Sequence, residues 1–207
     1  MLLARLRFKN IKIEMKRIIL ITAMAVVLSL QTKAQKGLKE GDKAPMFSGM
    51  DQNGKTVSLK SALKAHRSVV LFFYRGQWCP HCNKHIKNLQ DSLQLLTTKG
   101  AYIVGVSPET SAGVDKTVNK TKASFSIISD RDYKVMKAYK VNYVMEPGLA
   151  DRYKKGGLDV ALANGQTDYV LPVPATYIMD KSGKIKYVFF DKDYKKRPSV
   201  KTLAANL

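Results

Sequence analysis

The sequence predicts an α/β domain with a central mixed β-sheet flanked by helices. Three features support this prediction. Residues 69–74 form an unbroken β-prone run, as expected of a central strand buried on both faces. Cys79-Pro80-His81-Cys82 follows soon after, opening the segment 80–98, whose apolar residues recur at helical spacing. Near the end of the chain, two β-prone segments flank the turn Asp180-Lys181-Ser182-Gly183, which predicts a terminal hairpin.

The other elements can be read in chain order. Residues 51–55 predict a tight turn before a short strand, and Gly100 ends the long helix. Residues 145–170 are rich in glycine and lack clear periodicity, so we expect an insertion over the surface with a short helix or hairpin. The remaining predicted elements are strands at 56–59, 101–106, 176–179 and 184–190, an extended piece at 125–129, helices at 111–122 and 131–139, and a C-terminal helix from Ser199.

The first 34 residues have the pattern of an upstream extension and a signal peptide, which leaves residues 35–207 as the folded domain. Met15-Lys16-Arg17 precedes thirteen mostly apolar residues, 18–30. As a helix these rise only about 20 Å, too short to span a bilayer comfortably. We expect cleavage after Ala34 and an exported protein, periplasmic or extracellular, whose membrane contact is limited to the signal peptide. An uncleaved membrane anchor is the alternative.

The chain is strongly basic. Residues 1–34 hold seven Lys or Arg and one Glu, which leaves +14 of the formal +20 charge for the domain. Such a charge favours polyanions or membrane surfaces as partners. The lysines are scattered, however, and the longest basic run is Lys195-Lys196-Arg197. Zinc-finger spacing, an RNA-binding aromatic signature and a Gly-rich phosphate loop are all absent from the sequence. We therefore expect a solvated basic surface and no nucleic-acid partner.

Cys79 and Cys82 are the only cysteines. A disulfide between them would close so short a loop that it would constrain the unfolded chain very little. Its expected use is to be made and broken. Cys79 falls where a strand ends and a helix begins, where free N–H groups and the helix dipole favour a thiolate. Cys82, one turn later, can close onto it. The spacing predicts an exposed attacking thiol and a nearby resolving thiol, with a charged His81 adding to thiolate stability.

Metal binding is the competing interpretation of this segment. Cys79, Cys82, His81 and His85 could be gathered as zinc ligands. His81, however, lies between the two cysteines and could hardly join the same tetrahedron, and His66 is the only other histidine. Redox chemistry is favoured, with no metal and no cofactor expected.

A second element precedes the late strand. Pro174 in Leu171-Pro172-Val173-Pro174 is a candidate for a cis peptide bond, although a trans bond at a strand entry is commoner. Placed opposite Cys79, a cis Pro174 would leave the Val173 backbone ready to pair with a substrate chain.

These features belong to a wider set of motifs: Gly41-Asp42-x-Ala44-Pro45-x-Phe47, Tyr74-Arg75-Gly76-Gln77-Trp78-Cys79-Pro80-His81-Cys82, Val104-Gly105-Val106-Ser107-Pro108-Glu109, Ser129-Asp130 with Val135 and Ala138-Tyr139, and Pro174-Ala175-Thr176-Tyr177-Ile178-x-Asp180-x-x-Gly183. Over residues 39–192 the chain resembles the thioredoxin superfamily, and within it the AhpC/TSA (alkyl hydroperoxide reductase/thiol-specific antioxidant) group of peroxiredoxin-like proteins. The resemblance implies a thioredoxin-like fold, Cys79 as nucleophile, Cys82 as resolving thiol and Pro174 as the cis proline.

The chain departs from this pattern in three places. Typical peroxiredoxins have Thr or Ser where Gly76 stands, and an Arg near the late strand where Pro174 stands. Arg75 is a candidate to supply the missing positive charge. Thioredoxin has a carboxylate in place of Phe73, so the resolving thiol here would lack that proton acceptor.

We expect an exported thiol–disulfide oxidoreductase acting on protein or small-molecule thiols and disulfides. Pro80-His81, with Val173 before Pro174, is similar to the periplasmic oxidant DsbA, which implies an oxidising poise. The first alternative is a thiol peroxidase that reduces hydroperoxides through a sulfenic acid on Cys79. The second is a non-enzymatic metal- or partner-binding module. The residues expected around the cysteines are Arg75, Trp78, Pro80, His81, Val173 and Pro174. The sequence does not predict the physiological partner, the direction of electron flow or the oligomeric state.

Overall fold

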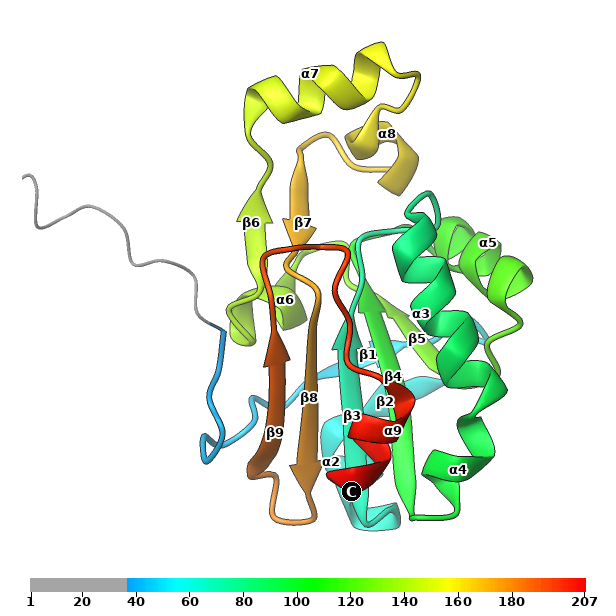
Figure 1. The fold of residues 1–207 in the computed structure, drawn as a ribbon, viewed down its shortest axis with the longest axis vertical. Helices are drawn as coiled ribbons and strands as arrows, with labels where there is room; N and C mark the ends of the chain where they lie inside the picture. Colours follow the sequence, from blue (N-terminus) through cyan, green and yellow to red (C-terminus); the bar gives the residue numbers. More distant parts are fainter. Residues whose placement is uncertain (1–36) are drawn as a thin grey trace, which may run out of the picture. The chain divides into compact units, whose positions relative to one another are not determined.

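The computed structural model describes residues 37–207, whose core is a five-stranded mixed sheet (Figure 1). The predicted leader, with its cleavage after Ala34, lies outside the described residues. The strand order is β5-β4-β3-β8-β9. The first three pair in parallel, and β8 runs antiparallel to both β3 and β9. The mixed sheet and its terminal hairpin are confirmed. The strands are β3 (Ser68–Phe73), β4 (Ala101–Ser107), β5 (Ser126–Ser129), β8 (Ala175–Asp180) and β9 (Ile185–Phe190).

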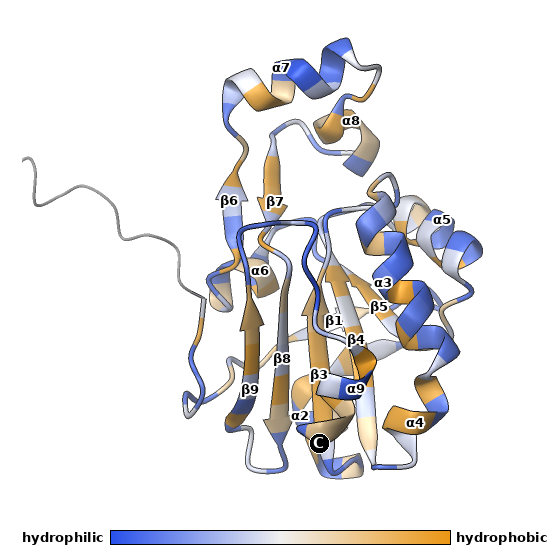
Figure 2. Ribbon diagram, viewed as in Figure 1, coloured by the Kyte–Doolittle hydropathy of each residue, from blue (hydrophilic) through white to orange (hydrophobic). Residues whose placement is uncertain are grey.

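The central strand β3 is buried along its whole length, as its unbroken apolar run predicts. Its side chains alternate between two cores on opposite faces of the sheet. Leu71 and Phe73 pack toward α2 and α6, whereas Val70 and Phe72 pack toward α3, α4, α5 and α9. Figure 2 shows the strands as the most hydrophobic part of the ribbon. The helices are α2 (Leu59–Ala65), α3 (Pro80–Asp91), α4 (Leu93–Thr97), α5 (Ser111–Thr121), α6 (Lys134–Ala138) and α9 (Val200–Ala205).

The single helix predicted over 80–98 is instead two helices, α3 and α4. The break falls at Ser92, whose φ of −111° and ψ of 18° lie outside the helical region. A serine adds no apolar side chain to the buried stripe, and because its hydroxyl competes for backbone hydrogen bonds it favours the end of a helix over its interior. Leu96, beyond the break, is still fully buried against the sheet. The prediction of one continuous helix was therefore wrong, although its apolar face was correctly located.

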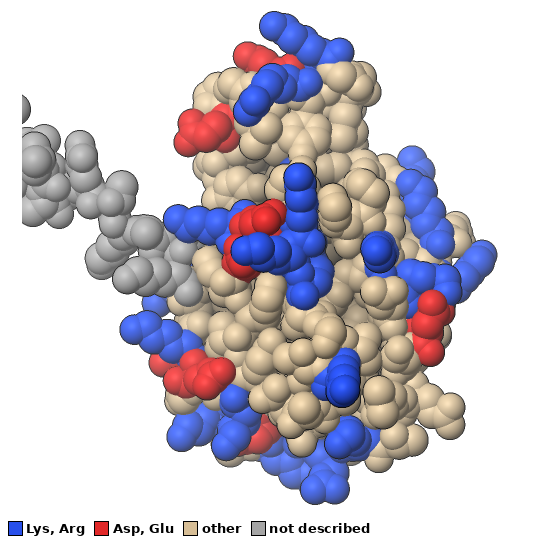
Figure 3. Space-filling model, viewed as in Figure 1, with Lys and Arg blue, Asp and Glu red and all other residues tan. Residues whose placement is uncertain are grey.

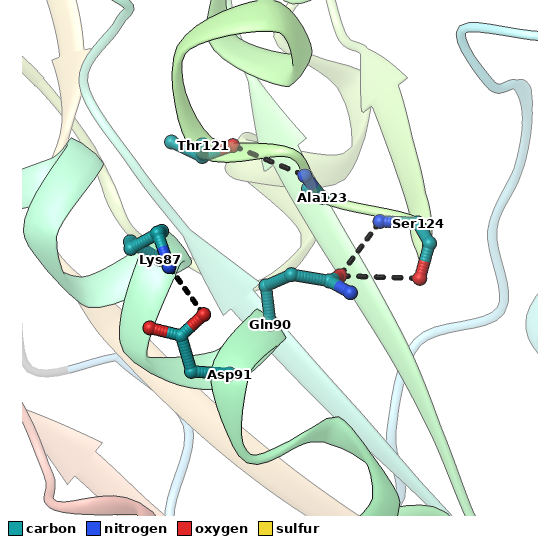
Figure 4. A network of polar contacts seen from close by, with 6 residues as sticks. All are labelled: Lys87, Gln90, Asp91, Thr121, Ala123 and Ser124. Atoms are coloured by element: carbon teal, nitrogen blue, oxygen red, sulfur yellow. Dashed lines mark hydrogen bonds and ion pairs between the residues drawn. The ribbon is translucent and has the colours of Figure 1, made fainter.

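The end of α3 is tied to the loop between α5 and β5. The Gln90 side-chain oxygen accepts from the Ser124 backbone N–H at 2.7 Å and from its hydroxyl at 3.1 Å (Figure 4). Lys87 and Asp91 form an exposed ion pair one turn apart on the same helix. These contacts fix the C-terminal end of the helix that begins at the cysteines.

The helix predicted over 131–139 is shorter, at Lys134–Ala138. Tyr133 has a φ of +58°, which ends the preceding turn and delays the start of the helix. The Asp130 carboxylate then accepts from the N–H groups of Val135 and Met136 at 3.1 and 2.8 Å. A short antiparallel pair, β1 (Ser48–Met50) and β2 (Thr56–Ser58), precedes the main sheet in the chain, and the turn between its strands is as predicted.

The predicted insertion contains both a strand pair and helices. Strands β6 (Asn142–Val144) and β7 (Val170–Pro172) pair antiparallel, and α7 (Pro147–Lys155) and α8 (Val160–Asn164) lie between them in the chain (Figure 1). The insertion has a small apolar core that includes Met145 and Leu171. Trp78 packs against it from residues 74–79, the loop between β3 and α3 that we call the cysteine loop. This part of the chain is therefore attached to the cysteine loop and does not simply lie over the surface.

The chain crosses from β9 to α9 through residues 191–199, which we call the C-terminal strap. Figure 2 shows this strap as hydrophilic. Lys196 and Asp191 form an ion pair across it at 3.2 Å. The predicted C-terminal helix follows, with the Ser199 hydroxyl capping it by accepting from the Thr202 N–H at 3.0 Å.

Lys and Arg side chains are spread over the face drawn in Figure 3, from α7 to the lower end of the sheet, with a few acidic residues among them. Within residues 37–207, every helix is too short or too polar to cross a membrane.

Candidate active site

Cys79 is the N-cap residue of α3, and Pro80 is the first residue of the helix. The Cys79 carbonyl accepts from the N–H groups of Cys82 and Asn83, both at 3.1 Å. The predicted position of Cys79 at the start of a helix is confirmed. The prediction that it is exposed was wrong, because Cys79 is only 1% exposed and Cys82 is 0% exposed. The insertion and the C-terminal strap, which the sequence did not place here, supply side chains around the pair.

The two thiols have opposite electrostatic environments. The Cys82 thiol donates a hydrogen bond to Cys79, and this lowers the pKa of Cys79 to about 6, helped by Arg75 and Arg197 and opposed by burial. Burial, together with the hydrogen bond and charge of Cys79, raises the pKa of Cys82 well above its usual range, while Arg197 acts in the opposite direction. At neutral pH the pair is therefore a thiolate at Cys79 and a thiol at Cys82.

Arg75 is buried, at 1% exposed, inside a cage of aromatic rings. Its guanidinium carbon lies 4.8 Å from the centre of the Trp78 ring, 4.3 Å from that of Tyr194 and 5.7 Å from that of Tyr153. Nη2 donates to the Tyr153 hydroxyl at 3.3 Å. Nε and Nη1 have no hydrogen-bond partner among the described residues. An arginine stays charged in such surroundings, so its two unused donors can serve an acceptor brought to Cys79.

Gly76 adopts a backbone conformation that only glycine accepts readily, with a φ of +151°. A Cβ atom at this position would lie 2.5 Å from Trp78 Nε1 and 2.6 Å from Asn164 Oδ1. Those two atoms are themselves hydrogen-bonded at 2.7 Å. Asn164 also donates from Nδ2 to the Arg75 carbonyl at 3.1 Å. The place where typical peroxiredoxins carry Thr or Ser is thus filled by a contact between the cysteine loop and α8.

Glu109 holds the same loop through a hydrogen bond from the loop's backbone. Its carboxylate is fully buried and accepts from the Gln77 N–H at 2.6 Å, the Ser107 hydroxyl at 3.1 Å and the Thr117 hydroxyl at 3.3 Å. Burial raises the pKa of Glu109, and these hydrogen bonds work against the rise. In the sequence Glu109 is only part of a motif, and its role in holding the loop emerges from the structure.

Arg197 is a site residue that the sequence did not reveal. Its Nη2 donates to Cys82 Sγ at 3.3 Å across 115 residues of chain. In the sequence it belongs to a basic run, Lys195-Lys196-Arg197, interpreted as surface. In the same strap, the Tyr194 ring packs against both Arg75 and His81. Only the path of the strap, which no local pattern encodes, brings these two residues to the cysteines.

The expectation for Val173 and Pro174 was wrong. All described peptide bonds are trans, including the one between these two residues. Val173 donates its N–H to the Val141 carbonyl at 2.7 Å, and both residues are buried. Strand β6 begins just after Val141 and β7 ends just before Val173, so the chain before β8 is already paired with its own backbone. The Val173 N–H is therefore not available to a substrate chain.

The histidines take separate positions. His81 is half-buried against Tyr194, with ring centres 5.8 Å apart, and Pro80 beside it is exposed. His85 is buried against Phe72, and burial, followed by the charge of Arg197, lowers its pKa to about 3. Within the described part of the chain, no three His, Cys, Asp or Glu side chains are grouped as a metal ion would require.

The sequence that builds this site is similar to those of known proteins. Residues 40–188 match the AhpC/TSA family. The chain belongs to the AhpC/TSA family. It is 30% identical over 152 residues to a chloroplastic peroxiredoxin Q from Oryza sativa subsp. japonica, covering 73% of this chain and 59% of the rice protein. It is 28% identical over 174 residues to chloroplastic peroxiredoxin Q from Arabidopsis thaliana, covering 82% and 69% of the two chains.

Solved structures agree on the fold. The peroxidoxin BcpB of Mycobacterium tuberculosis superposes with a TM-score of 0.60 at 21% identity, covering 76% of this chain and 90% of that one. Peroxiredoxin 6 of Arenicola marina gives a TM-score of 0.65 at 14% identity, covering 81% and 71%. The thioredoxin-like fold and the AhpC/TSA resemblance seen in the sequence are confirmed. The chain spans less than two thirds of the length of the rice protein.

Proposed function

We propose that this AhpC/TSA protein is a thiol peroxidase that reduces hydroperoxides, with Cys79 as the peroxidatic thiol and Cys82 as the resolving thiol. The observation that supports this most strongly is the pairing of a low-pKa Cys79 with Arg75, whose Nε and Nη1 have no partner among the described residues. A hydroperoxide needs a thiolate to attack one oxygen and donors to stabilise the other as it leaves. The relatives named peroxiredoxin support the same activity.

The reaction can be written with its atoms and electrons balanced. The Cys79 thiolate attacks the terminal peroxide oxygen, the O–O bond breaks, and the alkoxide or hydroxide that leaves takes up a proton. Cys79 is then a sulfenic acid. Cys82 loses its proton and attacks the Cys79 sulfur, hydroxide leaves as water, and a disulfide forms. An external dithiol, or two external thiols in turn, returns both cysteines to the reduced state and is itself oxidised to a disulfide.

The thiol–disulfide oxidoreductase favoured by the sequence is the second candidate. The Cys-x-x-Cys spacing supports it, since Cys82 can resolve a mixed disulfide as readily as a sulfenic acid. Capture of a substrate chain through Val173 was part of that hypothesis. The Val173 N–H is already bonded to Val141, and Cys79 is buried. Both facts favour a small substrate over an extended polypeptide.

Single-turnover kinetics separate the two functions. Reduced protein mixed with hydrogen peroxide or cumene hydroperoxide should change the fluorescence of Trp78, the only tryptophan, at a rate far above that of a free thiol. Cys79→Ser should abolish the signal. Cys82→Ser should retain it and leave a sulfenic acid that dimedone traps. If peroxide reacts no faster than with a free thiol while the protein reduces insulin disulfides, the oxidoreductase function is correct instead.

We further propose that the protein acts outside the cytoplasm and that a dithiol of the thioredoxin type recycles it. Export is supported by the signal-like pattern before Ala34 alone. A thiol reductant is supported by the yeast mitochondrial 1-Cys peroxiredoxin, which is described as resolved through glutathione and thioredoxin systems. Turnover with thioredoxin, with glutathione and with neither, measured by peroxide consumption, tests the second part.

A further inference from the structure

The surroundings of the proposed resolving thiol, Cys82, oppose its ionisation. Cys82 is fully buried, and both its burial and its neighbour Cys79 oppose its ionisation. It must nevertheless become a thiolate to attack Cys79. Thioredoxin has a carboxylate nearby as a proton acceptor, and Phe73 stands in its place here. Some other group has to favour the thiolate of Cys82.

Arg197 meets this requirement. Its Nη2 donates to Cys82 Sγ at 3.3 Å, within the range of a hydrogen bond to sulfur. Its Nη1 donates to the carbonyls of Tyr194 and Lys196 at 2.7 and 2.6 Å, and these two bonds hold the guanidinium in place. The strap that carries it is closed by the ion pair between Lys196 and Asp191. A charged donor fixed on a sulfur stabilises the anionic form of that sulfur over the neutral one.

Two observations argue against a purely structural role. Arg197 Nε is buried without a hydrogen-bond partner in the described chain, so packing alone does not use the whole guanidinium. The charge of Arg197 is also the largest influence that favours a Cys82 thiolate, whereas for Cys79 it ranks behind Cys82 and Arg75. Among the described residues, the other groups that act on this charge include Cys79 and Tyr143 of β6, which disfavour a second negative charge, and the Arg75 backbone N–H, which favours it less than Arg197 does. His85, one turn beyond Cys82 in α3, is buried, and burial and then the charge of Arg197 lower its pKa to about 3.

We propose that Arg197, delivered by the C-terminal strap, is a catalytic residue that activates Cys82 for closure of the Cys79–Cys82 disulfide. It contacts a reacting sulfur directly. Arg75 lowers the pKa of Cys79 more than Arg197 does. At Cys82 the order is reversed, and the Arg197 side chain contacts that sulfur. This inference deepens the proposed function, but its chemistry applies to any intermediate on Cys79 that Cys82 resolves.

The test therefore uses a probe other than peroxide. Dithiodipyridine, a small uncharged disulfide, oxidises the protein in two steps. The Cys79 thiolate attacks one sulfur of the probe, the probe's S–S bond breaks, and one thiopyridone leaves. Cys82 then loses its proton to solvent and attacks the Cys79 sulfur, and the expelled pyridinethiolate takes up a proton as the second thiopyridone. Each release is followed by absorbance, so the second phase reports the reactivity of Cys82 alone.

In Arg197→Gln, the second phase should be about three- to tenfold slower at pH 7. The thiolate fraction of Cys82 falls, and the rise in its intrinsic nucleophilicity offsets only part of that loss. The pH at which the second phase reaches half its maximal rate should move upward, and the difference from wild type should vanish at high pH. Arg197→Lys should restore part of the rate at pH 7. The first phase should change less than the second.

Lys201→Gln is the matched control, since it removes one positive charge from an exposed position in α9. It should leave both phases unchanged, and Cys82→Ser should lack the second phase. The proposal is overturned if Arg197→Gln behaves like Lys201→Gln, or if its second phase is slowed equally at every pH, as a packing defect would do. Peroxide kinetics on the same wild-type sample judge the peroxidase proposal separately. A slow peroxide reaction with an intact Arg197 effect would reject only that proposal.

Discussion

Replacing Gly76 with alanine should destabilise the domain and disturb the active-site loop, although it adds only one methyl group. The φ of +151° at this position is costly for any residue with a Cβ. The new Cβ would also lie 2.5 Å from Trp78 Nε1 and 2.6 Å from Asn164 Oδ1. No real Cβ contact is that short, so the hydrogen bond between Trp78 and Asn164 has to break or move.

The expected cost has two parts. The backbone strain is on the order of 1–3 kcal/mol. Losing the buried bond between Trp78 and Asn164 leaves a donor and an acceptor unsatisfied, for about another 1–3 kcal/mol. Gly54→Ala separates these parts, because Gly54 also has a positive φ, +71°, but a methyl group added there would meet nothing within 4 Å. Gly76→Ala should therefore exceed Gly54→Ala by at least the second amount, because a φ of +151° is also costlier for alanine than the left-handed φ of Gly54.

Urea unfolding followed by the fluorescence of Trp78 measures both variants against the wild type. The emission of folded Gly76→Ala should also shift, because the indole N–H loses its partner. Equal losses of unfolding free energy in Gly76→Ala and Gly54→Ala would refute the steric argument. They would mean that the Trp78 and Asn164 side chains move apart without a loss of stability. Gly76→Thr, which restores the residue of typical peroxiredoxins, should be at least as unstable as Gly76→Ala and should not raise peroxidase activity.

Three further predictions concern the thiol, the insertion and the leader. The rate of alkylation of Cys79 by iodoacetamide should have its midpoint near pH 6. Cys82→Ala should move that midpoint upward because it removes the donor that most lowers the Cys79 pKa. Mass spectrometry of the Cys79 peptide measures the midpoint, and the midpoint of a free thiol in the wild type would contradict this prediction. Asn164→Ala removes bonds to Trp78 and to the Arg75 carbonyl, and should lower the unfolding free energy by about 1–3 kcal/mol, whereas the exposed Asn119→Ala should not. Secretion from an exporting bacterium should yield a chain that begins at Gln35 by intact mass, and a full-length chain would exclude cleavage there.

Much of the fold could be predicted because its local sequence patterns match the burial and secondary structure that the folded chain shows. The apolar run in β3 is buried on both sides, the turn at 180–183 joins two strands, and Pro80 starts a helix at Cys79. Each of these features depends on residues close together in the chain. The family motifs lie in the same segments, so the AhpC/TSA relationship was also visible in the sequence.

The parts that could not be predicted depend on contacts between distant segments. Arg197 lies in a run of basic residues that looks like ordinary surface, and it meets Cys82 across 115 positions. Asn164 lies in a glycine-rich insertion without periodicity and meets Trp78 across 86 positions. The prediction for Val173 and Pro174 was wrong for a similar reason. Val173 is paired with Val141, a partner that becomes visible only once the insertion is folded.

Two of the three departures, Gly76 and Phe73, are therefore linked to the two segments that the sequence did not place. Gly76 is tolerated because Trp78 and Asn164 occupy the space of the missing side chain. Phe73 supplies no proton acceptor, and Arg197 instead donates to Cys82, which favours its thiolate. If the first link is real, the effects of Gly76→Ala and Asn164→Ala should not add. Removing the Asn164 side chain first relieves one of the two clashes and leaves no bond for the new methyl group to break. The double variant should then be about 1 kcal/mol more stable than the sum of the single losses predicts, and strict additivity would show that Gly76 and α8 are independent.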